Sequence, residues 1–247
     1  MKFEIVNIES TPSTNQYLFD LISKDDVDEG LVINTDDQTA GKGMGTNLWE
    51  SEPGRNLSFS FLLQPEFIKP ENQFVITQIV SLAILTVCQK SLKREDVKIK
   101  WPNDIYAGDK KLAGVLVQNI IKANKISHSV IGIGLNVNQE KFISDAPNPV
   151  SMIQLSGIDF DKDKLLNEIL FEIKQNYSRI RVYPVSSWLT SKYLENLYRI
   201  NQSNYFTDKD GKFKGEIVGI SKYGQLRIKR SGGHIELYAY KEVEFEL

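Results

Sequence analysis

The sequence changes character near residue 200, and this change constrains the fold more than any other feature. Before it, apolar residues recur at helical spacing over 73–90 and 161–177, between short strand-like runs. After Arg199, glycine-containing turns separate short β-prone runs at 216–220, 225–229, 235–240 and 243–247. Regularly spaced short strands with glycine turns are typical of small β-barrels. We therefore expect an α+β domain over residues 1–200 and a small β domain over residues 201–247.

The first domain is predicted to be a mixed sheet with helices packed against it. Alternating or continuous apolar runs predict strands at 3–8, 31–34, 56–63, 97–100, 111–119 and 127–137. Capping residues and apolar stripes predict helices from Ser13 or Thr14, over 73–90, from Asp161, and from Val185 toward Leu197. Residues 36–53 show no periodicity and are too long for a tight turn, which favours a functional loop.

Composition excludes several function classes. The 247 residues include 30 Lys or Arg and 32 Asp or Glu, and the net charge of −2 argues against a protein that coats nucleic acid. One cysteine, Cys88, allows no intramolecular disulfide, iron–sulfur cluster or Cys-rich zinc site. The N-terminus does not read as a signal peptide, and no stretch approaches the roughly 20 apolar residues of a membrane span. We expect a reduced, cytoplasmic protein that binds neither DNA nor membrane.

Three segments contain residues that can carry chemistry, and the first is a glycine-rich loop at 38–45. Glycines around Lys42 let backbone N–H groups approach an anion closely while the ammonium group supplies charge. The spacing matches neither a Walker A loop nor the dinucleotide-binding glycine pattern. An ordinary flexible turn is the alternative interpretation.

The second segment reads Lys-Trp-Pro-Asn-Asp at 100–104 and Lys-Leu-Ala-Gly at 111–114. Proline cannot continue the preceding strand, so the chain should turn and project Asn103 and Asp104 from the end of the sheet. Asp104 can then hold a cation or orient Lys111. The alternative is a turn with an Asp–Lys surface pair of little energetic value.

The third segment, at 131–138, contains Gly132 and Gly134 inside a predicted strand. Residues two positions apart lie on the same face of a strand. A ligand lying flat against that face would explain both glycines, because glycine otherwise weakens a strand. A β-bulge or close helix packing is the alternative.

Together these segments resemble the biotin–protein ligase family. Residues 100–114 match its Lys-Trp-Pro-Asn-Asp and Lys-Leu-Ala-Gly signature, and residues 132–136 match its Gly-x-Gly-x-Asn motif. Ser13-Thr14-Asn15 resembles its Ser-Thr-Asn motif, and residues 38–49 resemble its glycine- and arginine-rich loop that ends in tryptophan. The matches follow the family's order within residues 3–200. The resemblance implies a class II synthetase-like catalytic domain followed by a small SH3-like β-barrel domain.

The resemblance implies a reaction in two steps. The carboxylate of biotin attacks the α-phosphate of ATP, with Mg²⁺ accompanying the nucleotide, and biotinyl-5′-adenylate and pyrophosphate form. A lysine of a biotin carboxyl carrier protein or domain then attacks the adenylate and releases AMP. Both steps bring anionic groups together, so positive charge and oriented donors should dominate catalysis. We expect no metal site of the protein's own, with Mg²⁺ carried by ATP close to Asp104.

The resemblance also implies roles for individual residues. Lys111, Lys42 and Asp104 are expected to be catalytic, and Asp104 is also a candidate for deprotonating the acceptor lysine. Trp49, Asn103 and Asn136 are expected to bind ATP. The expected biotin-binding residues are Ser13, Thr14, Asn15, Gln38, Gly41, Lys42, Gly43, Met44, Lys111, Gly114, Gly132 and Gly134.

The glycine-rich loop departs from the family pattern. The family loop commonly reads Gly-Arg-Gly-Arg, whereas residues 41–44 read Gly-Lys-Gly-Met, and Thr46 stands where a further glycine is frequent. Lysine keeps the charge but loses the planar fork of arginine, and Met44 carries no charge. We expect the loop to order over biotinyl-adenylate, held mainly by Lys42 and backbone groups.

Two other functions stay open on the sequence alone. A lipoate or octanoate ligase or acyltransferase of the same fold needs a long apolar tunnel and, in the transferase, a cysteine nucleophile, for which Cys88 is poorly placed. A non-catalytic biotin-binding regulator would have lost the chemistry, whereas Lys111 and Asp104 are both present. Because the chain begins directly with the predicted strand at 3–8, we expect no DNA-binding repressor domain. A homodimer paired along sheet edges is left open.

Overall fold

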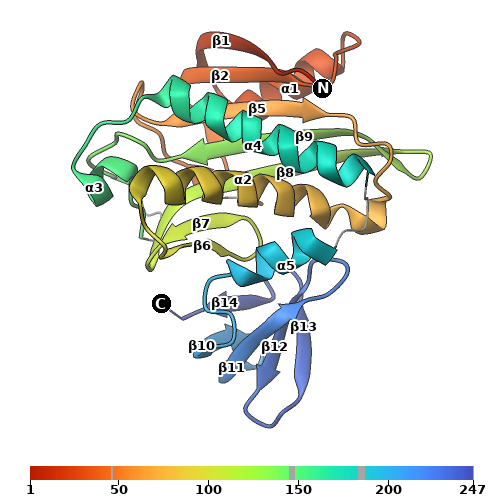
Figure 1. Cartoon of the computed structure of the whole chain (residues 1–247), viewed down its shortest axis with the longest axis vertical. Helices are drawn as coiled ribbons and strands as arrows, with labels where there is room; N and C mark the ends of the chain where they lie inside the picture. Colours follow the sequence, from red (N-terminus) through yellow and green to blue (C-terminus); the bar gives the residue numbers. More distant parts are fainter. Residues whose placement is uncertain (46, 145–147, 183–186, 247) are drawn as a thin grey trace.

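The computed structural model describes residues 1–45, 47–144, 148–182 and 187–246, and its centre is a seven-stranded sheet (Figure 1). The strand order is β1-β2-β5-β9-β8-β7-β6. β1 (Glu4–Thr11) runs parallel to β2 (Leu31–Gln38), and the other neighbouring pairs are antiparallel. The remaining strands are β5 (Leu57–Leu63), β6 (Val97–Lys100), β7 (Asp104–Ala107), β8 (Lys110–Lys122) and β9 (Lys125–Leu135). The predicted mixed sheet is confirmed.

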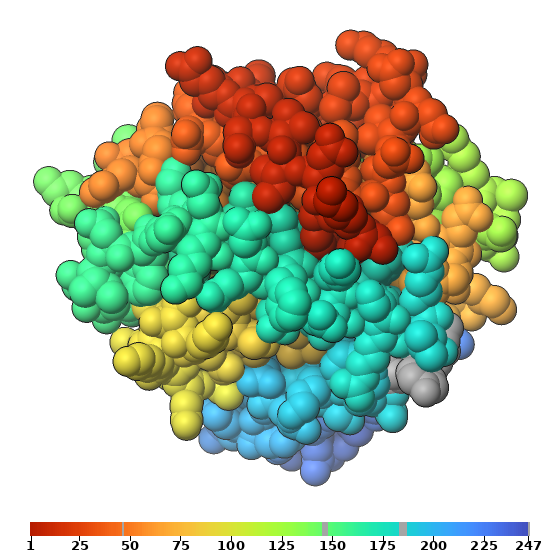
Figure 2. Space-filling model, turned by 45° about the horizontal axis from the view of Figure 1, so that its top comes forward, coloured from red at the N-terminus to blue at the C-terminus, as the bar shows by residue number. Residues whose placement is uncertain are grey.

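Helices cover both faces of this sheet. α2 (Phe74–Leu92) and α4 (Lys162–Val182) lie side by side over one face (Figure 1), and α4 lies on the molecular surface in Figure 2. α1 (Thr14–Ile22) lies on the other face, where Leu18 packs with Ile33, Leu62 and Val130. The central strand β5 is therefore buried at all seven positions. Two shorter helices complete the described part of this domain, namely α3 (Met152–Ser156) and α5 (Ser187–Glu195), with a 3₁₀ turn at Pro70–Asn72.

Strand β9 shows how side-chain alternation divides the two faces. Ile131 and Ile133 belong to the large core beneath α2 and α4, whereas Val130 packs beneath α1. Gly132 and Gly134 therefore lie on the α1 face. Their neighbours in register on that face are Ser60, Leu116, Ser58 and Gly114. All of these except Leu116 are small, and they leave the α1 face of the sheet open where β5, β9 and β8 meet.

The C-terminal residues form a five-stranded antiparallel sheet in the order β13-β12-β11-β10-β14. Its strands are β10 (Ser203–Asp208), β11 (Gly211–Ile220), β12 (Leu226–Arg230), β13 (Ile235–Tyr238) and β14 (Val243–Phe245). Trp101 joins this module to the larger sheet, because its Nε1 donates a 2.8 Å hydrogen bond to the carbonyl oxygen of Gly224. The predicted small β module is confirmed, and the boundary at residue 200 stays a prediction.

Several local predictions need correction. The segment 36–53 is not a structureless loop, because β2 continues to Gln38 and a short hairpin follows, formed by β3 (Gly41–Lys42) and β4 (Leu48–Trp49). The pattern also missed β7, β10 and α3, which are short or mostly polar. Thr46 and the predicted helix start at Val185 lie outside the described residues.

One helix bears on the expectation about membrane spans. The helical stretch from Pro70 to Leu92 has a mean hydropathy of 1.5, and its length and composition would suffice for a membrane span. However, most of it is buried inside the protein, where α2 packs against the sheet and against α4. A helix that is apolar on all sides is expected at such a place in the core.

Candidate active site

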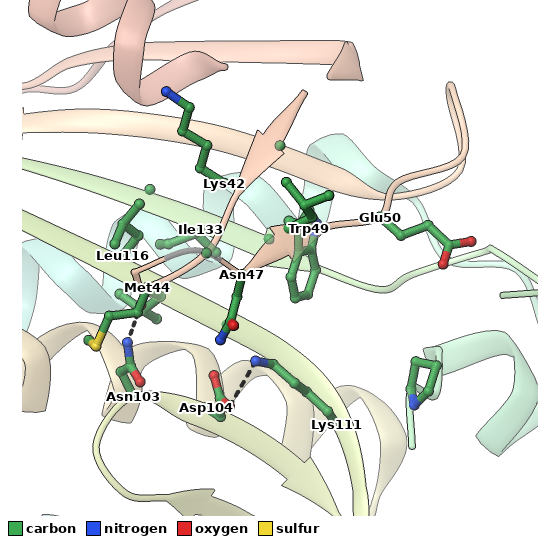
Figure 3. Close-up of a pocket in the computed structure, with 18 of the residues that line it drawn as sticks. Lys42, Met44, Asn47, Trp49, Glu50, Asn103, Asp104, Lys111, Leu116 and Ile133 are labelled. Carbon is green, nitrogen blue, oxygen red and sulfur yellow. Dashed lines mark hydrogen bonds and ion pairs between the residues drawn. The ribbon is translucent and has the colours of Figure 1, made fainter. Parts of the chain in front are cut away.

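A cavity of about 1280 Å³ lies on the open α1 face of the sheet, beneath the hairpin β3–β4 (Figure 3). Its walls come from the start of α1, the hairpin, strands β7 to β9 and the turn between β13 and β14. Every site residue predicted from the sequence lines this one cavity, namely Ser13, Thr14, Asn15, Gln38, Gly41, Lys42, Gly43, Met44, Trp49, Asn103, Asp104, Lys111, Gly114, Gly132, Gly134 and Asn136. Their individual roles are taken up as proposals below.

A β-bulge aims Lys111 into the cavity. In the pairing of β7 with β8, Asp104 lies opposite Gly114, but Tyr106 lies opposite Lys111, so β8 contains one extra residue. In a regular strand, residues three apart point to opposite faces. An extra residue between them, as in a β-bulge, puts them on the same face. Lys111 and Gly114 consequently share a face, and the Cε atom of Lys111 lies 3.4 Å from the position that a Cβ would take at Gly114.

Lys111 forms an ion pair with Asp104. The distance between Lys111 Nζ and Asp104 Oδ2 is 2.8 Å, and the two side chains are only 27% and 25% exposed. The neighbouring Asn103 is buried, and its side-chain amide donates to the carbonyl oxygen of Val115. The turn after β6 therefore projects its polar side chains into the cavity, as predicted, although Asp104 also begins the unpredicted strand β7.

Trp49 lies across a floor of glycines. A Cβ at Gly134 would overlap its indole ring, and a Cβ at Gly114 would lie 3.3 Å from its Cζ3 atom. Lys111 Nζ is 5.8 Å from the centre of the same ring. In Figure 3, Trp49 and Asn47 both point from the hairpin toward the Asp104–Lys111 pair. These contacts explain why a side chain is excluded at Gly134.

The other end of the floor meets a polar network at the start of α1. Asn15 stands over Gly132, where a Cβ would overlap its side chain. Asn15 Oδ1 accepts a 2.5 Å hydrogen bond from Ser60, and its amide nitrogen donates to Gln118 at 2.9 Å. Thr14 links this network to β2, with its hydroxyl 2.6 Å from Ser60 and 3.2 Å from Gln38 Oε1, while Ser13 caps the helix.

Two residues that line the cavity each have a buried polar atom without a hydrogen-bond partner among the described residues. These atoms are Trp49 Nε1, a donor, and Asn136 Oδ1, an acceptor. The amide nitrogen of Asn136 is occupied, because it donates to the carbonyl oxygen of Val150 at 3.0 Å. Buried polar atoms without partners are rare in proteins and point to a ligand that supplies the missing groups.

Glu50 holds the segment 142–144, which lies beside the cavity near Trp49. Its carboxylate accepts hydrogen bonds from the backbone N–H groups of Ile143 and Ser144, both at 2.9 Å, and from Gln139 at 3.1 Å. Burial acts to raise the pKa of Glu50, but these hydrogen bonds outweigh it and lower the pKa. Phe142 and Ser144 of this segment line the cavity.

Sequence reasoning missed several residues of the cavity. Lys100 donates a 3.1 Å hydrogen bond to the Tyr106 hydroxyl, and burial lowers its pKa. Its place in the Lys-Trp-Pro-Asn-Asp block was the available signal. Five residues of the C-terminal module carried no such signal, namely Tyr240, Lys241, Val243, Glu244 and Phe245. Lys42 lines the cavity but extends away from the Asp104–Lys111 pair in Figure 3.

Comparisons with known proteins agree with this geometry. The sequence profile of the Biotin/lipoate A/B protein ligase family matches residues 7–136. The bifunctional ligase/repressor BirA of Bacillus spizizenii is 28% identical over 241 residues, which cover 94% of this chain and 70% of the relative.

Solved structures extend the similarity to the whole chain. The biotin protein ligase from Aquifex aeolicus in complex with biotin and ATP superimposes with a TM-score of 0.81 at 24% identity, covering 98% of each chain. The biotin acetyl coenzyme A carboxylase synthetase from Helicobacter pylori with bound biotinylated ATP gives 0.64 at 25% identity, covering 95% of this chain and 99% of the other. The class II synthetase-like fold with an SH3-like C-terminal module is thus confirmed. Since the family profile spans more than half of the sequence, the chain belongs to the biotin/lipoate A/B protein ligase family.

Proposed function

We propose that this chain is a biotin–protein ligase that forms biotinyl-5′-adenylate from biotin and ATP. In the first step an oxygen of the biotin carboxylate bonds to the α-phosphorus of ATP, and pyrophosphate leaves. In the second step the amine of a lysine on a biotin carboxyl carrier protein bonds to the carbonyl carbon, AMP leaves, and the amine loses a proton. Membership of the biotin/lipoate A/B ligase family and the named biotin ligases among its relatives support this proposal.

The single observation that carries the proposal is the position of Lys111 between two different ends of one cavity. One end is the polar network around Asn15 and Gly132, and the other is the floor beneath Trp49 with the acceptor atom of Asn136. A ligand with a polar ring at one end, an anionic group in the middle and a nucleobase at the other end fits this arrangement of the cavity. Biotinyl-adenylate has these three parts in this sequence.

The Asn15 end suits the ureido group of biotin. A buried ureido group needs partners for its N–H and C=O groups, and hydroxyl and amide side chains supply both donors and acceptors. Thr14, Asn15 and Gln38 are already oriented by hydrogen bonds to one another or to Ser60. Ser13 completes this set at the helix cap. Gly132 lets Asn15 approach the strand at this end, and Gly114 keeps the floor beside it free of a side chain.

The Trp49 end suits adenine. An aromatic ring stacks on a base without regard to its identity, which is worth about 1–3 kcal/mol. Asn136 Oδ1 is a buried acceptor that an exocyclic amino group can satisfy. Asn103 lies on the same side of the cavity as Asp104 and would face the phosphates.

The middle of the cavity would stabilise the charge that the reaction brings together. Lys111 would bind the carboxylate and the α-phosphate, and Asp104 would keep its ammonium group oriented at 2.8 Å. Lys42 and the backbone of Gly41, Gly43 and Met44 would close over the adenylate when the hairpin moves. Mg²⁺ would arrive on the phosphates of ATP and neutralise part of their charge. Asp104 is the carboxylate that we expect to lie close to it. In the second step Asp104 can accept the proton of the acceptor lysine.

Pyrophosphate exchange into ATP tests the proposal when biotin, lipoate and octanoate are offered separately. We expect exchange with biotin. Exchange with lipoate or octanoate alone would replace the proposal by the sister ligase, and exchange with none would favour a binding protein. The sister acyltransferase is disfavoured because Cys88 is buried on α2, across the sheet from the cavity, and burial raises its pKa to about 12.

The proposed function extends to the cellular compartment and the protein substrate. We propose a cytoplasmic enzyme whose protein substrate is the carrier domain of a biotin-dependent carboxylase. A homodimer and the absence of DNA binding stay predictions from the sequence.

A further inference from the structure

The turn between β13 and β14 brings the C-terminal module into the cavity of the larger domain. Tyr240, Lys241 and Glu244 are among the residues that line the cavity from this side. The module is held in this place by the hydrogen bond from Trp101 to Gly224 and by Phe74, whose ring fills the space where Gly224 lacks a side chain. The module is therefore a wall of the site.

Lys241 is the residue of this turn that reaches the glycine-rich hairpin loop. Its Nζ atom lies 2.8 Å from the position that a Cβ would take at Gly45. Gly45 directly follows Met44 and has a φ of +70°. Residues 43–45 of the loop read Gly-Met-Gly and carry no charge. The ammonium group of Lys241 therefore brings a positive charge next to this uncharged part of the loop.

The ammonium group of Lys241 is available to a ligand. It makes no hydrogen bond or ion pair with any residue that the structure describes, and it lies 5.9 Å from the centre of the Tyr240 ring. The other lysines of the cavity differ in this respect. Lys111 is paired with Asp104, Lys100 donates to Tyr106, and Lys42 extends away from the centre of the site (Figure 3).

The backbone of Lys241 adds a second observation. Its φ is +68°, in the left-handed region that a residue with a side chain seldom occupies. Such a conformation costs free energy, and the surrounding structure must hold it in place. Here it presents the lysine side chain to the hairpin loop.

We propose that Lys241 binds the phosphate of biotinyl-adenylate from the C-terminal module and supplies the positive charge that the loop lacks at Met44. This proposal rests on the proposed function. A phosphate bound between the loop backbone and Lys241 joins the two domains across the intermediate. The adenylate is retained until the carrier lysine arrives.

The release of biotinyl-adenylate in the absence of carrier protein tests this role. We expect Lys241→Met to release the adenylate about tenfold faster than the wild type, because a charge-assisted hydrogen bond to phosphate is lost. Lys241→Arg should retain it. Lys209→Met is the matched control, since Lys209 lies in the same module with a side chain that is 88% exposed and is not part of the cavity. It should release the adenylate at the wild-type rate.

A restored charge on the loop separates electrostatics from folding. Met44→Lys in the Lys241→Met background should bring the release rate back toward the wild type, and the gap between wild type and Lys241→Met should narrow in high salt. Pyrophosphate exchange at varied ATP concentration gives the KM for ATP and shows whether Lys241 contacts the phosphates of ATP instead.

Three results would overturn the assignment. They are unchanged release in Lys241→Met, an equal change in Lys209→Met, and a defect confined to the KM for ATP. The failure of the proposed function looks different, because the wild type would then form no adenylate from biotin and ATP.

Discussion

Gly134→Ala should separate the nucleotide end of the cavity from the biotin end. The new methyl group would overlap the indole ring of Trp49. Strand β9 cannot move away, because it is paired on both sides at this position, with Ser58 and with Gly114. Trp49 belongs to a two-residue strand beside the exposed Leu48, so the hairpin will yield instead of the sheet.

The size of the effect follows from what Trp49 would lose. Stacking of one base on an aromatic ring contributes about 1–3 kcal/mol, so displacement of Trp49 should raise the KM for ATP roughly five- to 150-fold. The KM for biotin should rise much less, because Asn15 stands over Gly132 and not over Gly134. The free energy of unfolding should change by less than about 1 kcal/mol, since the strand keeps its pairing.

Gly132→Ala is the matched control two residues away on the same face. Its methyl group would overlap Asn15, which is hydrogen-bonded to Ser60 and Gln118 in a buried network. We expect a raised KM for biotin and a loss of about 1–3 kcal/mol in the free energy of unfolding, because buried polar groups lose partners. Pyrophosphate exchange with each substrate varied in turn measures both constants. If Gly134→Ala raised the KM for biotin and spared ATP, the assignment of the two ends would be wrong.

Three further predictions concern Lys111, the hydrogen bonds of Glu50 and the hydrogen bond between Trp101 and Gly224. Lys111→Met should lower kcat for pyrophosphate exchange about 10²- to 10³-fold with a wild-type fold, and a rise in KM alone would contradict its catalytic role. Glu50→Gln should destabilise the protein at neutral pH; because hydrogen bonds hold the folded pKa of Glu50 below 4.5, the difference in unfolding free energy from the wild type should vanish as the pH falls below 4.5. Trp101→Phe should reduce the free energy of unfolding in urea by about 1–3 kcal/mol, since the carbonyl of Gly224 loses its 2.8 Å partner, and an unchanged value would mean that this bond does not hold the module.

The parts of the fold that the sequence predicted are those decided by local periodicity. The apolar stripe over 73–90 became α2. The apolar residues at helical spacing within 161–177, namely Leu166, Ile169, Leu170, Ile173 and Tyr177, are buried on α4. The same reasoning missed β10, since its six residues include one fully buried side chain, Phe206. A strand that is mostly exposed has too little alternation to be read from the sequence alone.

The orientation of the Lys111 side chain could not be predicted in the same way. Regular alternation places Lys111 and Gly114 on opposite faces of β8, and only the bulge brings them together. A bulge depends on the partner strand, which in this protein is the missed strand β7. The contribution of Tyr240 and Lys241 was equally hidden, because it depends on how two domains pack and not on any motif within either.

The glycine floor and the bulge together explain how one cavity can serve two substrates. Gly132 and Gly134 are one strand repeat apart, and each admits a different covering side chain, Asn15 at one position and Trp49 at the next. Two ligands bound beside Asn15 and Trp49 would meet along the row that runs from Gly134 through Gly114 to Asp104. Lys111 reaches that row because the bulge turns it there, so the cation stands where a carboxylate and a phosphate must approach each other. Loss of the bulge residue would turn Lys111 to the core face and remove this charge without altering any residue that contacts either substrate.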